Sequence, residues 1–428
     1  MPKKSILHTL LATSVLVSGS NAIASEGLEI LEFKGFGTVA ATRTDSADNG
    51  YKATPQPASL ARGNSWSLQN DSLIGVQLDI APHNDLSGTV QVIGRNREQG
   101  DFEADFEWAF IKYKIDNNWR VRVGRVLTPA FMDSEYRFVG YANIYARPDP
   151  NIYTVYPLST HDGLDVTYRR NLDAGGTLTA SFYGGKAELE GPGNIIFEAS
   201  RLTGFSLRYE KDNFMVRVSN TQTNMIMSGS GAAMFPPFLA AAQTAVTQGC
   251  TSCINAVNAI RNGIEDTGLG ISNIGFRYSF DDYTAWGEYI KVHQNEILNP
   301  VDESYLLGLS KSIEKWTPYI TYSDNKTTSN ASKIDLSDIM KITIPPIKGA
   351  MLAYNSPAIF SKNNGRHTFA LGTRYDIAKN TAIFIEWAEI SLDDNVDSSP
   401  LPYPRLSPQG QPRDGKFHLY TLSLSFVF

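Results

Sequence analysis

Apolar residues recur at every second position in the last ten residues of the chain, which end on an aromatic residue. The alternating set is Tyr420, Leu422, Leu424, Phe426 and Phe428. Because successive side chains of a β-strand point to opposite faces, this set forms one apolar stripe. Chain ends usually fray in water, so a soluble protein seldom finishes on an exposed aromatic residue. The pattern is typical of a strand that closes a membrane β-barrel, where aromatic residues gather at the lipid boundaries. The last strand of a soluble sandwich is the alternative.

The start of the chain has the pattern of a secretory signal. Lys3 and Lys4 precede an apolar run over 6–17, and Ala22-Ile23-Ala24 offers a small-residue cleavage site. The run is well short of the ~20 residues that a spanning helix needs, which disfavours an uncleaved anchor. We therefore expect residues 1–24 to be removed and residues 25–428 to form a single domain.

The composition suits a barrel and disfavours a nucleic-acid-binding protein. Aromatic residues make up 11% of the chain, with 20 Tyr and 21 Phe, which fits a protein with aromatic girdles. The mean hydropathy is only −0.23, as expected when barrel strands alternate apolar and polar residues. The 38 basic and 44 acidic residues give a net charge of −6, so we expect no general binding to nucleic acid.

Alternating segments follow the signal in seven pairs, each of which reads as a hairpin. Turn-forming residues join most of these pairs, at 82–85, 116–118, 171–175, 211–213, 281–282 and 378–380. A first strand over about 31–42 and the C-terminal strand raise the number to sixteen. The sequence thus predicts an all-β fold, a 16-stranded antiparallel transmembrane β-barrel with short periplasmic turns and long external loops.

Three long interruptions lie at 223–266, about 324–364 and about 391–414. The first contains an Ala-rich stretch and a weak helical pattern in Ile254, Val257 and Ile260, which predicts one short loop helix. It also contains Cys250 and Cys253. In an exported chain we expect these cysteines to form a local disulfide. A redox pair, a metal-linked pair and free thiols are the alternatives.

Polar and charged residues alternate with the apolar stripes. They are Gln91, Arg95, Arg97, Arg120, Arg122, Arg217, Arg277, Arg374 and Glu386. A closed sheet of sixteen strands is wide enough to leave an aqueous lumen, which these side chains would line. Closure also removes the edge strands that would be unsatisfied in lipid.

The segment Trp119–Arg125, with its Gly-Arg ending, and the terminal Phe428 resemble the corresponding parts of Gram-negative outer-membrane general porins. The resemblance implies an outer-membrane channel, not an enzyme, that passes small hydrophilic solutes and ions by diffusion. It further implies a homotrimer in outer-membrane lipid and an inward-folded constriction loop over 126–160. No cofactor is implied.

On this interpretation the constriction contains Asp133 and Glu135 from the loop, with Arg137 as a further candidate. The wall opposite them contains Arg95, Arg97, Arg120 and Arg122. A basic wall opposite an acidic loop sets a transverse field that filters ions by charge. The sequence leaves open whether Arg125, Arg147 and Asp149 line the pore.

Other functions are compatible with a barrel. An enzyme is disfavoured, because the six His are scattered and neither His-Glu-x-x-His nor Gly-x-Ser-x-Gly occurs. A substrate-specific anion channel, for phosphate, sulfate or a carboxylate, would use the arginine cluster as its binding surface. A structural or adhesive barrel is the third alternative.

Overall fold

The structure is a computed structural model of the 428-residue chain. It describes residues 30–53, 61, 63–96, 102–155, 158–173, 175–191, 195–265, 267–294, 301–328, 338, 341–354, 364–393 and 415–428. The signal segment predicted at 1–24 lies outside these ranges, and so does Arg97.

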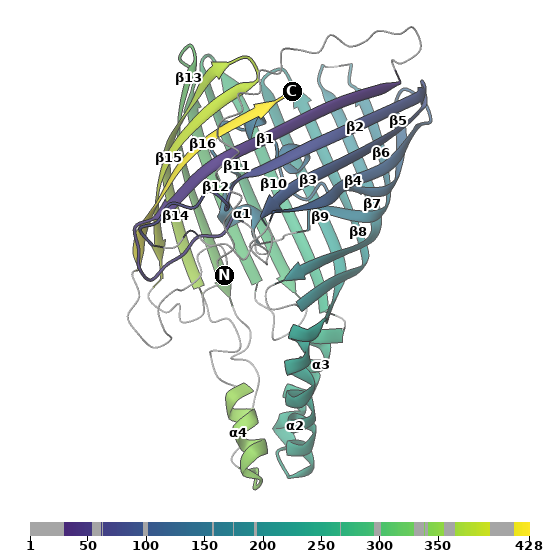
Figure 1. The fold of residues 1–428 in the computed structure, drawn as a ribbon. Coiled ribbons are helices and arrows are strands. Elements are labelled where there is room, and N and C mark those ends of the chain that lie inside the picture. The colour runs from purple at the N-terminus through teal and green to yellow at the C-terminus, as the bar shows by residue number, and fades with distance from the viewer. Residues whose placement is uncertain are drawn as a thin grey trace, which may run out of the picture.

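Sixteen antiparallel strands form one closed barrel, in which each strand pairs with its neighbours in sequence and β1 pairs with β16 (Figure 1). This confirms the predicted fold. The strands are β1 (Leu31–Thr44), β2 (Leu73–His83), β3 (Leu86–Asn96), β4 (Phe102–Lys114), β5 (Trp119–Leu127), β6 (Thr160–Asn171), β7 (Thr177–Gly191), β8 (Ile195–Lys211), β9 (Phe214–Ser228), β10 (Thr267–Phe280), β11 (Tyr283–Gln294), β12 (Val301–Lys311), β13 (Trp316–Thr328), β14 (Asn364–Ala378), β15 (Thr381–Leu392) and β16 (Lys416–Val427).

The barrel closes where β1 meets β16, and the register runs from Phe36 opposite Val427 to Thr44 opposite Leu419. Beyond the last strand residue, Gly35 and Phe428 exchange both backbone hydrogen bonds, at 2.8 and 2.9 Å. The Phe428 ring lies against Gly35, where a Cβ would approach the ring within 2.1 Å. The terminal residue therefore completes the seam.

The outer face of the barrel is apolar. Phe33, Ile111, Val123, Leu164, Phe182, Leu307, Ile385 and Leu422 each expose 45–63% of their surface. The alternate residues of these strands face the interior and are mostly polar, as the buried Thr38, Thr167, Ser323 and Thr421 illustrate. The period-2 pattern of the sequence is thus a division between an apolar outside and a polar inside.

Three helices extend from the loop end of the barrel, at the bottom of Figure 1. They are α2 (Phe235–Thr247), α3 (Ile254–Glu265) and α4 (Pro345–Tyr354). We call them the helical extension. The sequence predicted one short helix here and was wrong about the number. The Ala-rich stretch is helical in its own right, and α4 begins with Pro345 and Pro346, which suit a first helical turn.

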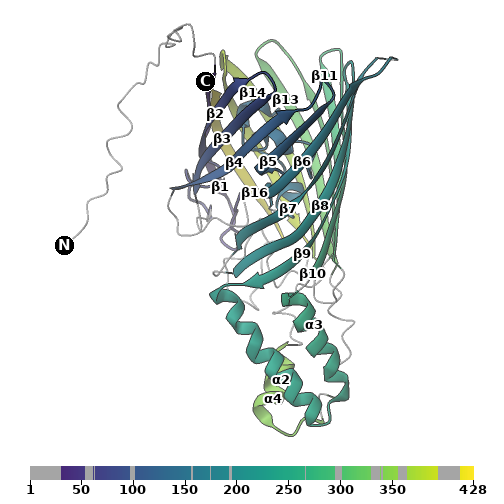
Figure 2. The same cartoon turned by 90° about the vertical axis from the view of Figure 1, so that its right-hand side faces the viewer.

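The helical extension has a small apolar core of its own, formed by Ala242, Ala245, Cys253, Val257 and Ile342 among others. Because α2 contacts both α3 and α4, two loops far apart in sequence pack together (Figure 2). Within the described residues, no helix combines the length and hydropathy needed to cross a membrane.

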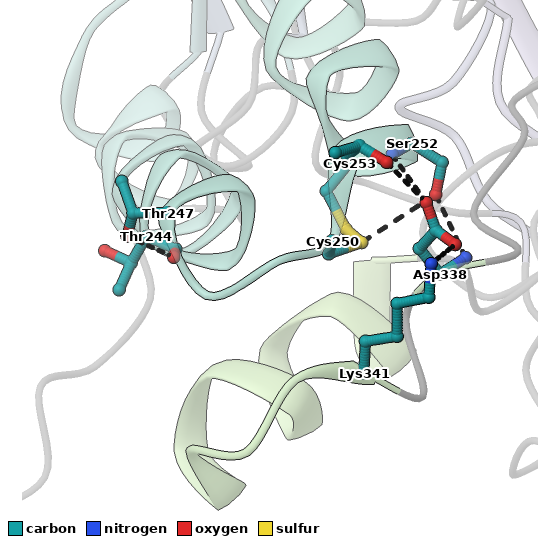
Figure 3. The surroundings of a disulfide bond; sticks show 8 residues. Thr244, Thr247, Cys250, Ser252, Cys253, Asp338 and Lys341 are labelled. Atoms are coloured by element: carbon teal, nitrogen blue, oxygen red, sulfur yellow. Dashed lines mark hydrogen bonds and ion pairs between the residues drawn. A yellow bond between two sulfur atoms is a disulfide. The ribbon is translucent and has the colours of Figure 1, made fainter.

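Cys250 and Cys253 are joined by a disulfide between α2 and α3 (Figure 3). Asp338, from the other loop, accepts hydrogen bonds from the Thr251 hydroxyl at 2.7 Å and the Ser252 amide at 3.2 Å. The Lys341 ammonium lies 2.6 Å from the same carboxylate. These contacts, with the Lys341 ion pair first, lower the pKa of Asp338 to about 2.

We predict that replacing both Cys250 and Cys253 by Ala leaves the barrel's urea midpoint unchanged but speeds proteolysis within 229–266. So short a closed loop removes little entropy from the unfolded chain, and both cysteines belong to the apolar core of the helical extension. Thiol labelling of the exported wild-type protein should be negligible without reductant. Ready labelling of both cysteines in the native protein would contradict the bridge.

Candidate functional site

The chain between β5 and β6 folds into the barrel rather than over its rim. We call residues 128–159 the inward loop, of which 156–157 are not described. It contains two 3₁₀ turns, Ser134–Tyr136 and Gly140–Ala142, and the short helix α1 (Pro150–Tyr153), which is drawn within the barrel outline in Figure 1. Its contacts are with inward-facing residues of the strands.

Asp133 is fixed against β10 and is only 2% exposed. The Arg277 guanidinium lies 3.0 Å from its carboxylate, and the Tyr136 hydroxyl donates to it at 2.5 Å. The Tyr145 hydroxyl donates to the second oxygen. Asp133 is therefore an anchor of the loop, enclosed by hydrogen bonds.

Glu135 is fixed against β9 by Arg217. The two side chains form a bidentate pair, with N–O distances of 2.8 and 2.6 Å, and Arg217 is 4% exposed at its side chain. Arg217 also donates to the backbone carbonyls of Phe131 and Met132. Burial alone would raise the pKa of Glu135, but the facing guanidinium outweighs it and holds this pKa below its ordinary value of 4.5.

The middle of the loop is anchored on β11. The Met132 amide and the Tyr153 hydroxyl both donate to the Glu288 carboxylate, at 2.8 and 3.2 Å. Around this contact lies an apolar core inside the barrel, which includes Phe131, Tyr145, Ile152, Trp286 and Tyr319. The interior is thus partly filled on this side.

The later part of the loop reaches β13 and β14. Arg374 donates to the carbonyls of Tyr141 and Asn143 at 2.7 and 2.8 Å. Asn151 accepts from Arg366 at 2.6 Å and donates to Ser323 at 2.9 Å. The loop leaves β5 and is anchored along the wall that β9 to β14 form.

The inward faces of β4 to β8 carry six cationic side chains toward the turn end. They are Lys112, Lys114, Arg120, Arg122, Arg169 and Arg208, which the strand register places on adjacent rows. We call this set the basic wall. Two of its members have carboxylate partners, because Asp165 lies 3.0 Å from Arg122 and Glu210 lies 2.6 Å from Arg208.

A cavity of about 480 Å³ lies in the wall just beyond the end of the pairing between β4 and β5, and we call it the acidic cavity. The pairing of β4 with β5 ends at Ala109 and Arg125, so the upper part of β4 faces β6 to β8 across this cavity. Its lining includes Glu103, Asp105, Glu107, Glu188, Glu190 and Glu198. Arg95 borders it, 3.9 Å from Glu107 and with its guanidinium 4.7 Å from the centre of the Phe138 ring.

The residues of the predicted constriction therefore divide into separate sets. The structure brings Arg120 and Arg122 together in the basic wall, but places Arg95 on the acidic cavity. The ion-pair partners of Asp133 and Glu135 are Arg277 and Arg217, which the sequence had placed on the polar face without pairing them to the loop.

Three residues that the sequence left open have defined positions. Arg125 stays on the face of Val123, because no register shift interrupts β5, and it pairs with Asp162 at 2.8 Å. Arg147 is inside, 3.6 Å from Asp71 and 3.7 Å from Glu386. Asp149 caps α1 by accepting from the Asn151 amide, and burial raises its pKa to about 6.

Sequence reasoning missed several contributors. Lys112, Lys114 and Glu288 alternate with outward-facing residues, so the same period-2 rule would have found them. Asn143 lies in irregular chain, where no periodicity indicates a direction. Within the described ranges, no group of three or more His, Cys, Asp or Glu side chains could hold a metal ion.

No family model matches the chain, and no curated protein matches it. Solved outer-membrane barrels, by contrast, match almost its whole length. OmpT of Vibrio cholerae with loop L8 deleted superimposes with a TM-score of 0.52 at 11% identity, covering 94% of this chain and 100% of that one. The anion-selective porin from Comamonas acidovorans gives 0.51 at 14% identity, covering 93% and 100%. Salmonella typhi OmpF gives 0.52 at 12%, covering 93% and 97%. The chain has the barrel fold of these proteins.

We predict that the Glu135–Arg217 pair contributes a coupling free energy of about 2 kcal/mol, in the range of hydrogen bonds between charged groups. A double-mutant cycle with Glu135→Gln and Arg217→Gln, read as urea unfolding in lipid vesicles, measures it. The exposed pair Lys291–Glu303, with side chains 45% and 42% exposed, is the control and should give less than about 0.5 kcal/mol.

The pH dependence of this coupling has a defined sign. Because the pKa of Glu135 is lowered in the folded protein, the stabilisation is complete above the ordinary pKa of 4.5 and is lost as the pH falls through the folded value. Equal coupling for the two pairs at pH 7, or a coupling that grows on acidification, would contradict this account of the anchor.

Proposed function

We propose that this chain is an outer-membrane, porin-like channel through which small hydrophilic solutes and ions diffuse passively. The observation that carries the proposal is the reversal of polarity between the two faces of the closed sheet. Large apolar side chains cover the outside, while charged and hydroxyl side chains line the inside. A protein in water buries its apolar face, so this arrangement is stable only with lipid outside and water inside.

Aromatic side chains on the outer face support a membrane position. Near the turns, Trp119 packs on Tyr168 and Trp316 on Tyr375, with ring centroids 4.7 and 4.4 Å apart. Nearer the loops, Tyr305 packs on Tyr322 and Phe369 on Trp387. The two levels are six residues apart on β13 and β14, or about 20 Å along a strand. Because barrel strands tilt by about 40°, the levels are roughly 15 Å apart along the barrel axis, so both lie within the ~25 Å apolar band of a spanning barrel.

The passage we propose runs beside the inward loop, between it and β2 to β6. Anchors such as Glu135–Arg217 and Asn151–Arg366 hold the loop on the far wall, so the constriction lies between the loop and the near wall. We propose that Arg95, Arg120 and Arg122 contribute to this narrowing. A solute that enters from the loop end then meets the acidic cavity before the basic wall.

A substrate-specific anion channel is the second candidate, and the basic wall favours it. Six cations lie on neighbouring rows with two carboxylate partners between them, which leaves a net positive surface. Such a surface concentrates anions near it. Block of the chloride current by a low concentration of one oxyanion would identify this function.

We further propose that the exported chain loses residues 1–24 and assembles as a homotrimer. One of the matched structures is described as a trimer form of OmpT from Vibrio cholerae. An unheated sample that migrates as a trimer and a heated one that migrates as a monomer would support the assembly.

The function is tested by reconstituting the folded protein in planar bilayers. We expect discrete current steps that scale with salt concentration, because the proposed passage is filled with water. As a control, protein that has been boiled before addition should give none. If the folded barrel inserts into the membrane but gives no current steps, the protein is not a diffusion channel, and the structural barrel remains as the alternative.

Charge selectivity tests the basic wall. Replacing Arg120 and Lys114 by Gln should shift selectivity toward cations, by roughly twofold for each charge if each lies about 8 Å from the ion, where one charge contributes about 0.5 kcal/mol in water. Lys291→Gln on the outer face of β11 is the control and should leave the reversal potential unchanged. The shift should shrink at 1 M salt, where screening shortens to about 3 Å. Equal reversal potentials for all three proteins would place the ion path elsewhere.

A further inference from the structure

A second, smaller cavity of about 90 Å³ lies between the inward loop, the segment that leads into β2, and the end of β3. Its lining includes three arginines, Arg95, Arg137 and Arg147, together with Asn143 and Asp71. Arg95 also borders the acidic cavity, so the two cavities adjoin. The small cavity lies on the same side of the inward loop as the proposed passage, and Arg95 belongs to both.

Buried polar atoms without hydrogen-bond partners gather around it. Asn143 is 2% exposed, and neither its amide nitrogen nor its amide oxygen has a partner. Arg137 Nη1, Arg147 Nε and Asp71 Oδ2 are likewise buried without one. A buried polar group left unpaired costs about 1–3 kcal/mol, so a cluster of them around one cavity indicates a polar ligand.

Arg137 is the cation least compensated by its surroundings. Arg147 has Asp71 and Glu386 nearby, and Arg95 has Glu107. The Arg137 guanidinium donates to the Tyr153 carbonyl at 3.3 Å and lies between aromatic rings, 5.0 Å from the centre of Phe138 and 5.7 Å from that of Tyr153. Burial lowers the pKa of Arg137 to about 10, so it remains charged at neutral pH.

The donors and acceptors of the cavity complement each other. Arg137, Arg147 and the Asn143 amide nitrogen offer hydrogen-bond donors, as a carboxylate requires. Asp71 Oδ2 and the Asn143 amide oxygen offer acceptors, which would take a hydroxyl or an ammonium group. Asp71 also disfavours a dianion, because a second negative charge would lie against it.

The size of the cavity limits the ligand to a small molecule. A water-sized site takes about 10–15 Å³ of such volume, so the 90 Å³ present accommodates roughly six to nine non-hydrogen atoms. Lactate and alanine both fall within this range. A sugar does not.

We propose that this cavity binds a short carboxylate with a hydrogen-bond donor on its α-carbon, a 2-hydroxy or 2-amino acid. Arg137 and the Asn143 amide nitrogen hold the carboxylate, while Asp71 and the Asn143 amide oxygen accept from the α-substituent. The proposal deepens the proposed function and rests on it for the ligand's entry into the barrel. Binding itself requires only the folded protein.

The test is isothermal titration calorimetry on the full folded protein in detergent, with lactate, alanine, propionate and sulfate as separate probes. We expect lactate, alanine or both to bind at millimolar concentration. The tighter of the two identifies the preferred α-substituent, a hydroxyl or an ammonium group. Propionate, which lacks the donor, should bind at least about tenfold more weakly, and sulfate should bind no better than propionate.

Variants distinguish this site from the rest of the interior. Arg137→Gln should abolish binding, and Lys291→Gln on the outer face should leave it unchanged. If Arg137→Gln does not fold, Asn143→Ser should weaken binding by about tenfold or more. Three results would each overturn the proposal: equal affinity for propionate and lactate, no heat for any probe because water alone fills the cavity, or unchanged binding in folded Arg137→Gln or Asn143→Ser.

Conductance measured on the same preparation separates the two claims. Binding without current steps would overturn the diffusion channel and keep the binding site. Current steps without binding would overturn the binding site and keep the channel.

Discussion

The whole structure depends on the pairing of every strand edge. A sheet with an apolar outer face cannot leave backbone groups unpaired in lipid, because each unpaired group there costs several kcal/mol. The pairing of β1 with β16, completed by the reciprocal bonds of Gly35 and Phe428, removes the last two edges. Closure at sixteen strands also fixes the width of the interior. This width leaves the space inside the barrel that the inward loop occupies.

Within that space, buried ion pairs and hydrogen bonds decide where the loop lies. Asp133 and Glu135 are bound to Arg277 and Arg217 on one part of the wall, and Asn151 is bound to Arg366 on another. Each anchor would be costly to break, because it would leave a charge buried without its partner. The charges that remain toward the opening are those of the basic wall and the acidic cavity, so the anchors also determine which charges a solute can meet.

The regular part of the molecule could be predicted from the sequence, and the irregular part could not. All sixteen strands follow from period-2 patterns and turn residues, because side-chain direction in a strand is fixed by the backbone. The same rule places Arg122 and Arg277 inside. It gives no direction for Arg137, Asn143 or Arg147, which lie in irregular chain, and it cannot identify the partner of Asp133. Those pairings depend on where the loop lies in the barrel, which is a tertiary property.

The central claim, a closed wall with a loop fixed inside it, is tested most directly by hydrogen–deuterium exchange of the protein in lipid bilayers. The account predicts that β1 and β16 exchange as slowly as β7 and β8, since none of them is an edge. It also predicts slow exchange at the amides of Met132 and Asp133, which donate to Glu288 and to Tyr153. Fast exchange along β1 and β16, or throughout 128–155, would contradict closure or the fixed loop respectively.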